Sequence, residues 1–235
     1  MSLYHQFFVA LLSTCLLVST PVDPPRAEKF IPPAQGDLFF RAGGEDGTSL
    51  LAALSAVAEA SGAHLQMDSV TARGLRETAV GFDRDLTVPA AEAWAVIEQA
   101  LLQADYALSL VNRGERTVLA VRSVGRPAVL GMAYTRISVD ELSLAKMHPA
   151  VLFEVNMALS ALDSRTLSNH LRGLLAGDHF TGCSYLGGRD LLIRGVGSEV
   201  FSLASFCIES DERAMRRAVE EQRRLAADSK VEEAH

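Results

Sequence analysis

The 235-residue sequence has few of the residues that build metal centres, disulfide frameworks or aromatic sites. Aromatic residues make up 6% of the chain and Trp94 is the single tryptophan, so the core is expected to be aliphatic. The three cysteines and six histidines form no H-E-x-x-H, C-x-x-C or H-x-H spacing of the kind that predicts a zinc site. We therefore expect no bound metal and no cofactor.

Basic charge is also scarce, because the formal net charge is -7. An acidic chain repels the phosphate backbone, which argues against general nucleic-acid binding. The glycine pairs Gly43-Gly44 and Gly187-Gly188 sit between a strand and the next element, whereas an RNA clamp requires a basic G-x-x-G loop between two helices. No nucleic-acid partner is expected.

Catalytic motifs are missing as well, since neither a G-x-S-x-G elbow nor a P-loop occurs. The histidines have no catalytic or ligand spacing, and the aspartates that flank Arg84 suit a turn or a helix dipole better than a catalytic dyad. The chain is predicted to be non-enzymatic, with no catalytic, cofactor-binding or metal-binding residue. The residues weighed for these roles were His64, His148, His170, His179, Asp83 and Asp85.

The longest apolar run lies at the N-terminus and fits a signal peptide better than a membrane span. Residues 7–18 carry no charge, whereas a span needs about 20 apolar residues. Prolines follow at Pro21, Pro24 and Pro25. Residues 1–27 are predicted to be a signal peptide, with a membrane anchor as the alternative because no Lys or Arg precedes the run. Either reading makes the chain an exported protein.

Export affects how the cysteines are interpreted. If Cys15 is removed with the signal peptide, Cys183 and Cys207 remain, and an oxidising compartment can bridge an even pair. The alternative is two buried free thiols, because cysteine is often a small core residue. The sequence leaves both open.

Hydrophobic periodicity divides the remainder into two small units of α+β class. Residues 28–36 are a proline-rich linker. Residues 37–124 alternate short strands with two helical stripes, over residues 50–60 and 90–103, and end in a hairpin. The predicted order is β-α-β-(β)-α-β-β, with a polar stretch before the bracketed strand, which is assigned to residues 78–82.

The second unit, residues 150–210, follows a connector over residues 125–149 that holds one short helix, residues 138–146. Its pattern predicts β-α-β-β-α in a mixed sheet, a KH-like topology. Residues 211–235 form a charged helical tail with acid–base pairs four residues apart. That tail is either an exposed helix or a helix that binds a partner.

The second unit resembles the second periplasmic N-domain of bacterial secretins. Leu159, Leu162 and Asp163 match the phrase that ends a strand in that family, and residues 190–193 match its "Asn-x-Leu-Ile-Ile" strand. Residues 50–68 and 88–110 resemble the preceding secretin N-domain, which also occurs as the signalling domain of outer-membrane receptors. The 235 residues contain no segment long enough for the secretin barrel domain.

The resemblance implies a periplasmic protein-interaction module, without a pore-forming role. We expect a scaffold or adaptor of secretion or pilus machinery that binds a secretin-like or inner-membrane secretion protein, or associates with itself. The alternative is a sensory domain that contacts a membrane regulator. The sequence does not identify the partner, the oligomeric state or the secretion system.

Overall fold

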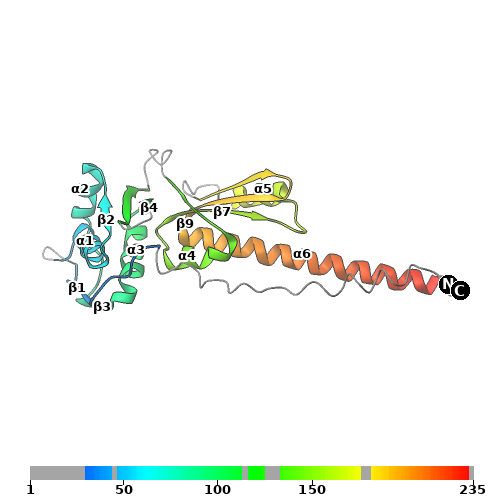
Figure 1. Ribbon diagram of the computed structural model, residues 1–235, viewed down its shortest axis with the longest axis horizontal. Helices are drawn as coiled ribbons and strands as arrows, with labels where there is room; N and C mark the ends of the chain where they lie inside the picture. Colours follow the sequence, from blue (N-terminus) through cyan, green and yellow to red (C-terminus); the bar gives the residue numbers. More distant parts are fainter. Residues whose placement is uncertain (1–29, 44–46, 113–115, 125–132, 176–180, 233–235) are drawn as a thin grey trace, which may run out of the picture.

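The computed structural model describes residues 30–43, 47–112, 116–124, 133–175 and 181–232. The predicted signal peptide lies outside the described residues. Figure 1 shows two lobes side by side, with helix α6 projecting from the second. The elements are β1 (Leu38–Phe40), α1 (Leu50–Ser61), β2 (His64–Gln66), α2 (Ser69–Glu77), β3 (Leu86–Val88), η2 (Ala90–Glu92), α3 (Ala93–Gln103), β4 (Tyr106–Asn112), β5 (Val118–Ser123), β6 (Thr135–Ile137), η4 (Val139–Glu141), α4 (Leu142–Met147), β7 (Leu152–Ala158), α5 (Ser164–Leu174), β8 (Gly182–Gly187), β9 (Asp190–Val196) and α6 (Gly197–Glu232).

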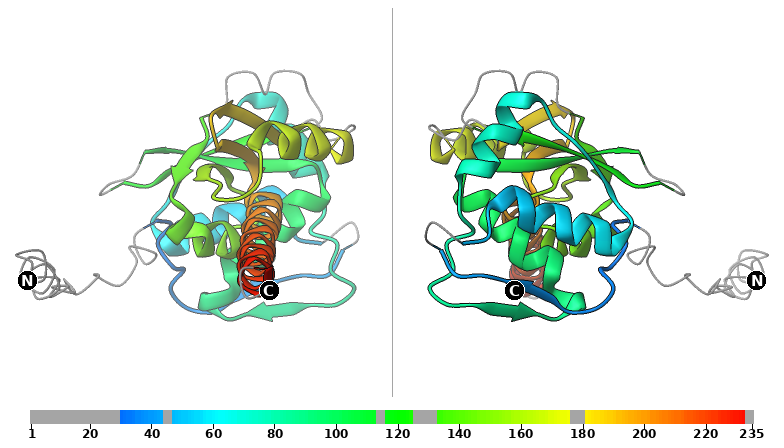
Figure 2. Two further views of the ribbon diagram at one scale, coloured as in Figure 1. Left: turned by 90° about the vertical axis from the view of Figure 1, so that its right-hand side faces the viewer. Right: turned by 90° about the vertical axis from the view of Figure 1, so that its left-hand side faces the viewer.

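The first lobe contains two small sheets beside a pair of packed helices, α1 and α3 (Figures 1 and 2). One sheet has the order β2-β5-β4 and the other is the antiparallel pair β1-β3. Helix α1 begins where the Ser49 side chain accepts a hydrogen bond from the Ala52 N–H, and it ends at Gly62 in the left-handed conformation. Both ends agree with the predicted helix.

The polar stretch of the first lobe folds differently from the prediction. Asp68 caps a helix, α2, by accepting from the Val70 and Thr71 N–H groups. The strand expected over residues 78–82 is reduced to one bridge between Ser49 and Ala79, and the partner of β1 is β3. Only Thr71 and Leu75 of α2 are buried, which is too short a stripe for periodicity to detect.

The second lobe is a four-stranded mixed sheet with the order β6-β7-β9-β8. From β7 onward it has the predicted β-α-β-β-α order, and the α+β class is confirmed. Phe153, Val155 and Met157 of β7 are buried on the face that packs against the helices, whereas Asn156 and Ala158 on the other face are exposed. Helix α6 contacts β7 and β9, and α5 contacts mainly β8.

The segment predicted as a connector, residues 125–149, contributes a strand to this sheet. Strand β6 pairs in parallel with β7, and the predicted short helix follows as η4 and α4, opened by a Ser138–Glu141 capping box. The prediction missed β6, because its three residues lie in a segment without a clear hydrophobic pattern and their pairing partner, β7, follows them in the chain.

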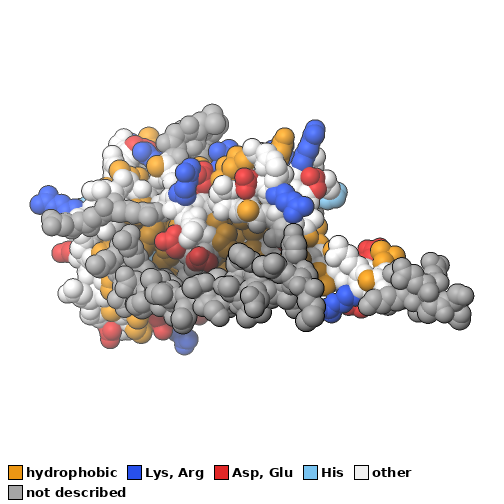
Figure 3. Space-filling view, turned by 45° about the vertical axis from the view of Figure 1, so that its right-hand side comes forward, with side chains coloured by type: hydrophobic (Ala, Val, Ile, Leu, Met, Phe, Trp, Pro, Cys, Tyr) orange, Lys and Arg blue, Asp and Glu red, His pale blue; other side chains and the backbone are white. Residues whose placement is uncertain are grey.

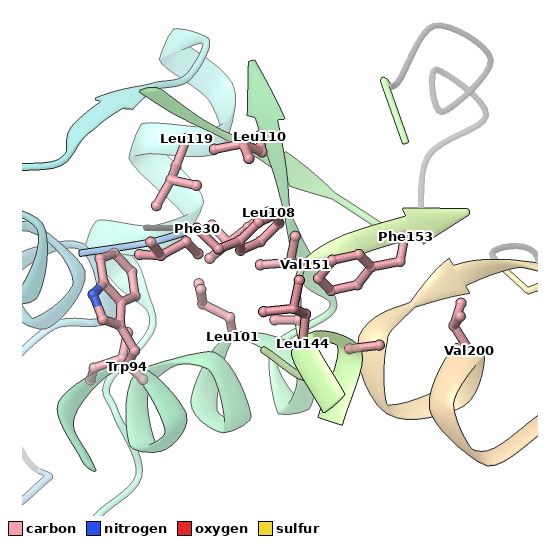
Figure 4. Packing of buried hydrophobic residues seen from close by; sticks show 14 of the residues in the cluster. Phe30, Trp94, Leu101, Leu108, Leu110, Leu119, Leu144, Val151, Phe153 and Val200 are labelled. Atoms are coloured by element: carbon pink, nitrogen blue, oxygen red, sulfur yellow. The ribbon is translucent and has the colours of Figure 1, made fainter. Parts of the chain in front are cut away.

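One hydrophobic core runs through both lobes (Figure 4). Leu101 and Leu108 from the first lobe lie toward Val151 from the second, with Trp94 and Phe153 on opposite sides of them in this view. Phe30, in the segment predicted as a linker, is buried and its ring stacks on that of Phe153 with centroids 5.4 Å apart. Since the core is continuous, the boundaries of the two units stay a prediction.

Candidate interaction surface

A buried carboxylate joins the two lobes at the centre of this core. Glu98 of α3 is fully buried, and its Oε1 lies 2.8 Å from Nδ1 of His148, in the turn between α4 and β7. Its Oε2 accepts a hydrogen bond of 3.0 Å from the Ala150 N–H. The Ala150 carbonyl in turn accepts from the Leu108 N–H at 2.9 Å. Strand β7 is therefore tied to both α3 and β4.

Burial raises the pKa of the Glu98 carboxyl, and the hydrogen bonds from His148 and Ala150 oppose that rise. The pair is enclosed by Phe30, whose ring centroid lies 5.6 Å from that of His148. These contacts position the two lobes against each other. The position of Glu98 in the sequence indicates its burial. It follows Trp94 by four residues and Ile97 by one, so it lies inside the apolar stripe of the helix.

The other residues weighed for chemistry do not converge on a site. His64 on β2 and His170 on α5 are exposed and far apart in the fold, and His179 lies outside the described residues. Asp85 accepts a hydrogen bond of 2.8 Å from the Ala42 N–H, which is a structural role. Within the ranges given above, no three metal-ligating side chains form a cluster. In the same ranges, no helix combines the length and hydrophobicity that a membrane span requires.

Both cysteines of the second lobe are buried free thiols in the structure, Cys183 on β8 and Cys207 on α6. Burial raises the pKa of both, and the nearby Cys183 contributes to raising the pKa of Cys207 to about 12. Both thiols belong to the hydrophobic core that lies between the sheet and α6. The bridge between them stays a prediction.

A thiol count on a Cys15→Ser variant distinguishes a disulfide between Cys183 and Cys207 from two buried free thiols. Because the thiolate is the reactive form, we expect native Cys183 and Cys207 to react with a disulfide reagent at least about 100-fold more slowly than in the unfolded protein. Unfolding a sample purified from an oxidising compartment then releases two reactive thiols if they are free and none if they are bridged. Fast labelling of the native protein would contradict the buried, high-pKa environment of both residues.

The two-stranded sheet β1-β3 carries the most accessible aromatic side chain among the large exposed hydrophobic residues. Phe39 on β1 is 59% exposed and lies opposite the exposed Thr87 of β3. Among the described residues these strands pair only with each other. A sheet of two strands is marginal by itself and has open edges to which a third strand can pair.

The edge of the larger sheet at β8 is partly closed by contrast. The Cys183 carbonyl accepts hydrogen bonds from Ser168 Oγ at 3.3 Å and from Arg172 Nε at 3.0 Å, both on α5. Side chains that occupy an edge carbonyl protect that edge from pairing with another chain. Of these two edges, β1-β3 is the more open to a partner strand.

A surface hollow of about 1430 Å³ lies beside β3. Its lining is mainly apolar and comes from the start of β3, the outer side of α3 and the turn that holds His148. Figure 3 shows apolar side chains in the middle of one face of the molecule and again on the projecting part of α6. The lining includes Ile31, Phe82, Leu86, Trp94, Met147 and Pro149.

No protein-family model matches the chain, and no curated protein matches it. Among solved structures, it is similar to the Klebsiella pneumoniae type II secretion system outer membrane complex of PulD, PulS and the PulC HR domain. That match has 15% identity and a TM-score of 0.49, and covers 73% of this chain but only 26% of the other. The GspC-GspD complex of the enterotoxigenic Escherichia coli type II secretion system matches at 14% identity and a TM-score of 0.27, covering 76% of this chain and 99% of that one. Both are type II secretion components, and the assignment to secretin N-domains stays a prediction.

Proposed function

We propose that this chain is a non-enzymatic protein–protein interaction module of the periplasm, acting as a scaffold or adaptor in secretion or pilus machinery. The observation that carries the proposal is Phe39, a largely exposed aromatic residue on a sheet whose two strands, among the described residues, pair only with each other. Exposed aromatic residues beside an open strand edge are typical of sites that bind an extended peptide.

The proposed partner is an extended segment of a secretin-like or inner-membrane secretion protein. Backbone hydrogen bonds to β1 or β3 supply affinity, and Phe39 together with the apolar hollow beside β3 receives alternate side chains of that segment. Glu98 and His148 support the surface indirectly, because they fix α3, which lines the hollow. The N-terminal residues 1–27 would deliver the chain to the periplasm as a signal peptide or anchor.

Replacing Phe39 by aspartate is expected to abolish partner recovery while the protein stays folded. Truncating a central aromatic contact weakens binding by at least about tenfold, and a charge against an apolar segment weakens it further. The matched control is Val111→Asp, at the end of β4, where the side chain is 54% exposed on the other sheet. The measurement is quantitative recovery of envelope proteins with the tagged full-length chain, after site-specific photocrosslinking from position 87, which lies opposite Phe39 on β3.

The expected result is a crosslink from position 87 to a secretin-like or inner-membrane secretion protein, lost in Phe39→Asp and retained in Val111→Asp. If position 87 crosslinks no such protein, or if both variants recover the same partner equally, the proposal is wrong.

A further inference from the structure

The imidazole ring of His148 belongs to the lining of the mainly apolar hollow beside β3. Its side chain is 10% exposed, and its Nδ1 lies 2.8 Å from Oε1 of the fully buried Glu98. Within the described part of the chain, no hydrogen-bond partner reaches Nε2, and this atom is not among the buried side-chain atoms closed to solvent. The second nitrogen of a nearly buried ring is therefore open to an occupant of the hollow.

An occupant has to supply a hydrogen-bonding atom at this nitrogen. Covering Nε2 with hydrocarbon would leave a buried polar atom without a partner, which costs free energy. Nε2 donates when it carries a proton, and it accepts when the neutral ring carries its proton on Nδ1. A peptide group offers both a C=O acceptor and an N–H donor, so an extended backbone satisfies Nε2 in either state, whereas an acyl chain satisfies it in neither.

The charges near the ring favour an uncharged stretch of peptide. Glu98 already lies against Nδ1, so a carboxylate at Nε2 would put two acidic groups on one imidazole ring. A cationic side chain would lose its hydration in a lining that is mainly apolar and already includes Lys146. Large apolar side chains of an occupant would contact Ile31, Phe82, Leu86, Trp94 and Met147.

We propose that the hollow binds an uncharged apolar stretch of the partner segment, and that His148 Nε2 makes a direct hydrogen bond to the backbone of that stretch. The proposal rests on the proposed function, because this segment is the one that pairs beside Phe39. Leu86 at the start of β3 and His148 line the same hollow, so a segment that pairs with β3 and continues into the hollow reaches the ring. His148 then contributes to specificity as well as joining the two lobes.

Photocrosslinking from position 99 tests where the segment lies. Gln99 is exposed on α3 and lines the hollow, whereas the matched control, Gln66, is exposed on β2 of the other sheet and lies outside the lining. With the full chain in the envelope, we expect a photoreactive residue at 99 to capture the partner captured from position 87, and one at 66 not to capture it. A crosslink from 87 without one from 99 overturns this proposal and leaves the proposed function standing, whereas a failure at both positions overturns both.

The fluorescence of Trp94 tests the chemistry of the occupant, because this single tryptophan of the chain lines the hollow. The probe is an acetylated and amidated hexapeptide of leucine, alanine and threonine, compared with two variants that carry aspartate or lysine in the third position. We expect a saturable change in emission with the uncharged peptide and affinities at least about tenfold lower, roughly 1.4 kcal/mol, for both charged peptides. Tighter binding of either charged peptide, or no saturation with the uncharged one, would contradict the proposal.

Two substitutions separate the contact in the hollow from the contact at the junction of the lobes. Asparagine places its amide at the position of Nδ1 and keeps the bond to Glu98, but it has no atom at the position of Nε2. We expect His148→Asn to keep the denaturation midpoint of wild type and to bind the uncharged peptide at least about tenfold more weakly. His148→Gln, whose amide reaches the position of Nε2, should be less stable and yet bind more tightly than His148→Asn. The matched control, His170→Asn on the exposed side of α5, should change neither property.

The proposal is wrong if His148→Asn binds the uncharged peptide as tightly as wild type does, since Nε2 would then take no part. Crosslinks from position 99 to lipid, to a second copy of the chain or to residues 1–29 of the same chain would assign the hollow to a different occupant and also overturn it. Mass spectrometry of the crosslinked peptides distinguishes these cases.

Discussion

Glu98→Ala is expected to lower the free energy of unfolding by about 3 to 5 kcal/mol, the range measured when one partner of a buried polar pair is removed. The alanine leaves His148 Nδ1 without its hydrogen-bond partner and the Ala150 N–H without its acceptor, in a site closed to water. It also opens a cavity between α3 and the second lobe. Chemical denaturation measures the loss, and Gln99→Ala, an exposed neighbour on the same helix, is the control.

Glutamine at position 98 is expected to be far less damaging, within about 1 kcal/mol of wild type. Its amide oxygen can accept from the Ala150 N–H, and its NH₂ group can donate to His148 Nδ1 when the neutral ring carries its proton on Nε2. The pair of variants therefore separates the hydrogen-bond geometry from the charge. Equal destabilisation by alanine and glutamine would show that the negative charge is essential at the junction.

The dependence of this effect on pH follows from the raised pKa of Glu98. Between the ordinary value of 4.5 and the higher folded value, the folded state holds more protons than the unfolded state. The contribution of Glu98 is therefore complete below pH 4.5 and declines as pH rises through the folded pKa. Glu98→Gln should gain stability relative to wild type over that range, and a difference that is flat with pH would contradict the raised pKa.

Local patterns predicted the elements with long stripes or good capping residues. The apolar spacing of α1, with Ser49 before it and Gly62 after it, is visible in the sequence, and so is the strand–helix order from β7 to α6. Elements with a very short buried pattern were missed. Strands β3 and β6 were missed although β1 and β2, which are equally short, were predicted, because the pairing of β3 and β6 is decided by the strands beside them in space.

The junction between the lobes was beyond prediction for a related reason. Phe30 lies in a proline-rich segment that reads as a linker, yet Trp94 Nε1 donates to the Pro32 carbonyl at 3.1 Å and Phe30 stacks on Phe153. These contacts join residues more than fifty positions apart, and no local period reports them. His148 was weighed as a ligand, but its partner Glu98 became visible only once α3 was placed against β7.

The interaction surfaces also combine features that the sequence shows with features that only the fold reveals. The charge pattern of the tail was visible in the sequence as pairs four residues apart, which left an exposed helix and a partner-binding helix as alternatives. Which side of α6 continues the buried side of the second lobe is a property of the fold. The exposure of Phe39 is a property of the fold too, since an LFF strand is equally compatible with a buried position.

Asp211 gives the second large effect, because its carboxylate holds the loop between β7 and α5. Although Asp211 is only 8% exposed, its oxygens accept from the backbone N–H groups of Ser160 at 2.6 Å, Ala161 at 2.8 Å and Leu162 at 2.7 Å. Burial raises its pKa, but these three hydrogen bonds outweigh that contribution, and the Arg189 guanidinium adds to them, so the pKa is lowered overall.

Asp211→Asn is expected to cost about 2 to 3 kcal/mol of unfolding free energy, since bonds from backbone donors to a carboxylate are among the stronger ones. The amide has one acceptor oxygen, so its NH₂ group must face a backbone N–H, and one donor loses its partner. The neighbouring exposed Glu212→Gln is the control and should change stability by less than about 0.5 kcal/mol.

The contribution of Asp211 to stability depends on pH with the opposite sign to the contribution of Glu98. A lowered folded pKa makes the contribution of Asp211 complete above the ordinary value of 3.8 and removes it as pH falls through the folded value. The stability gap between wild type and Asp211→Asn should therefore close on acidification, while the gap between Glu98→Gln and wild type changes at higher pH. A gap for Asp211→Asn that persists at the lowest pH at which the protein still folds would mean that the loop is held by packing, with the carboxylate as a bystander.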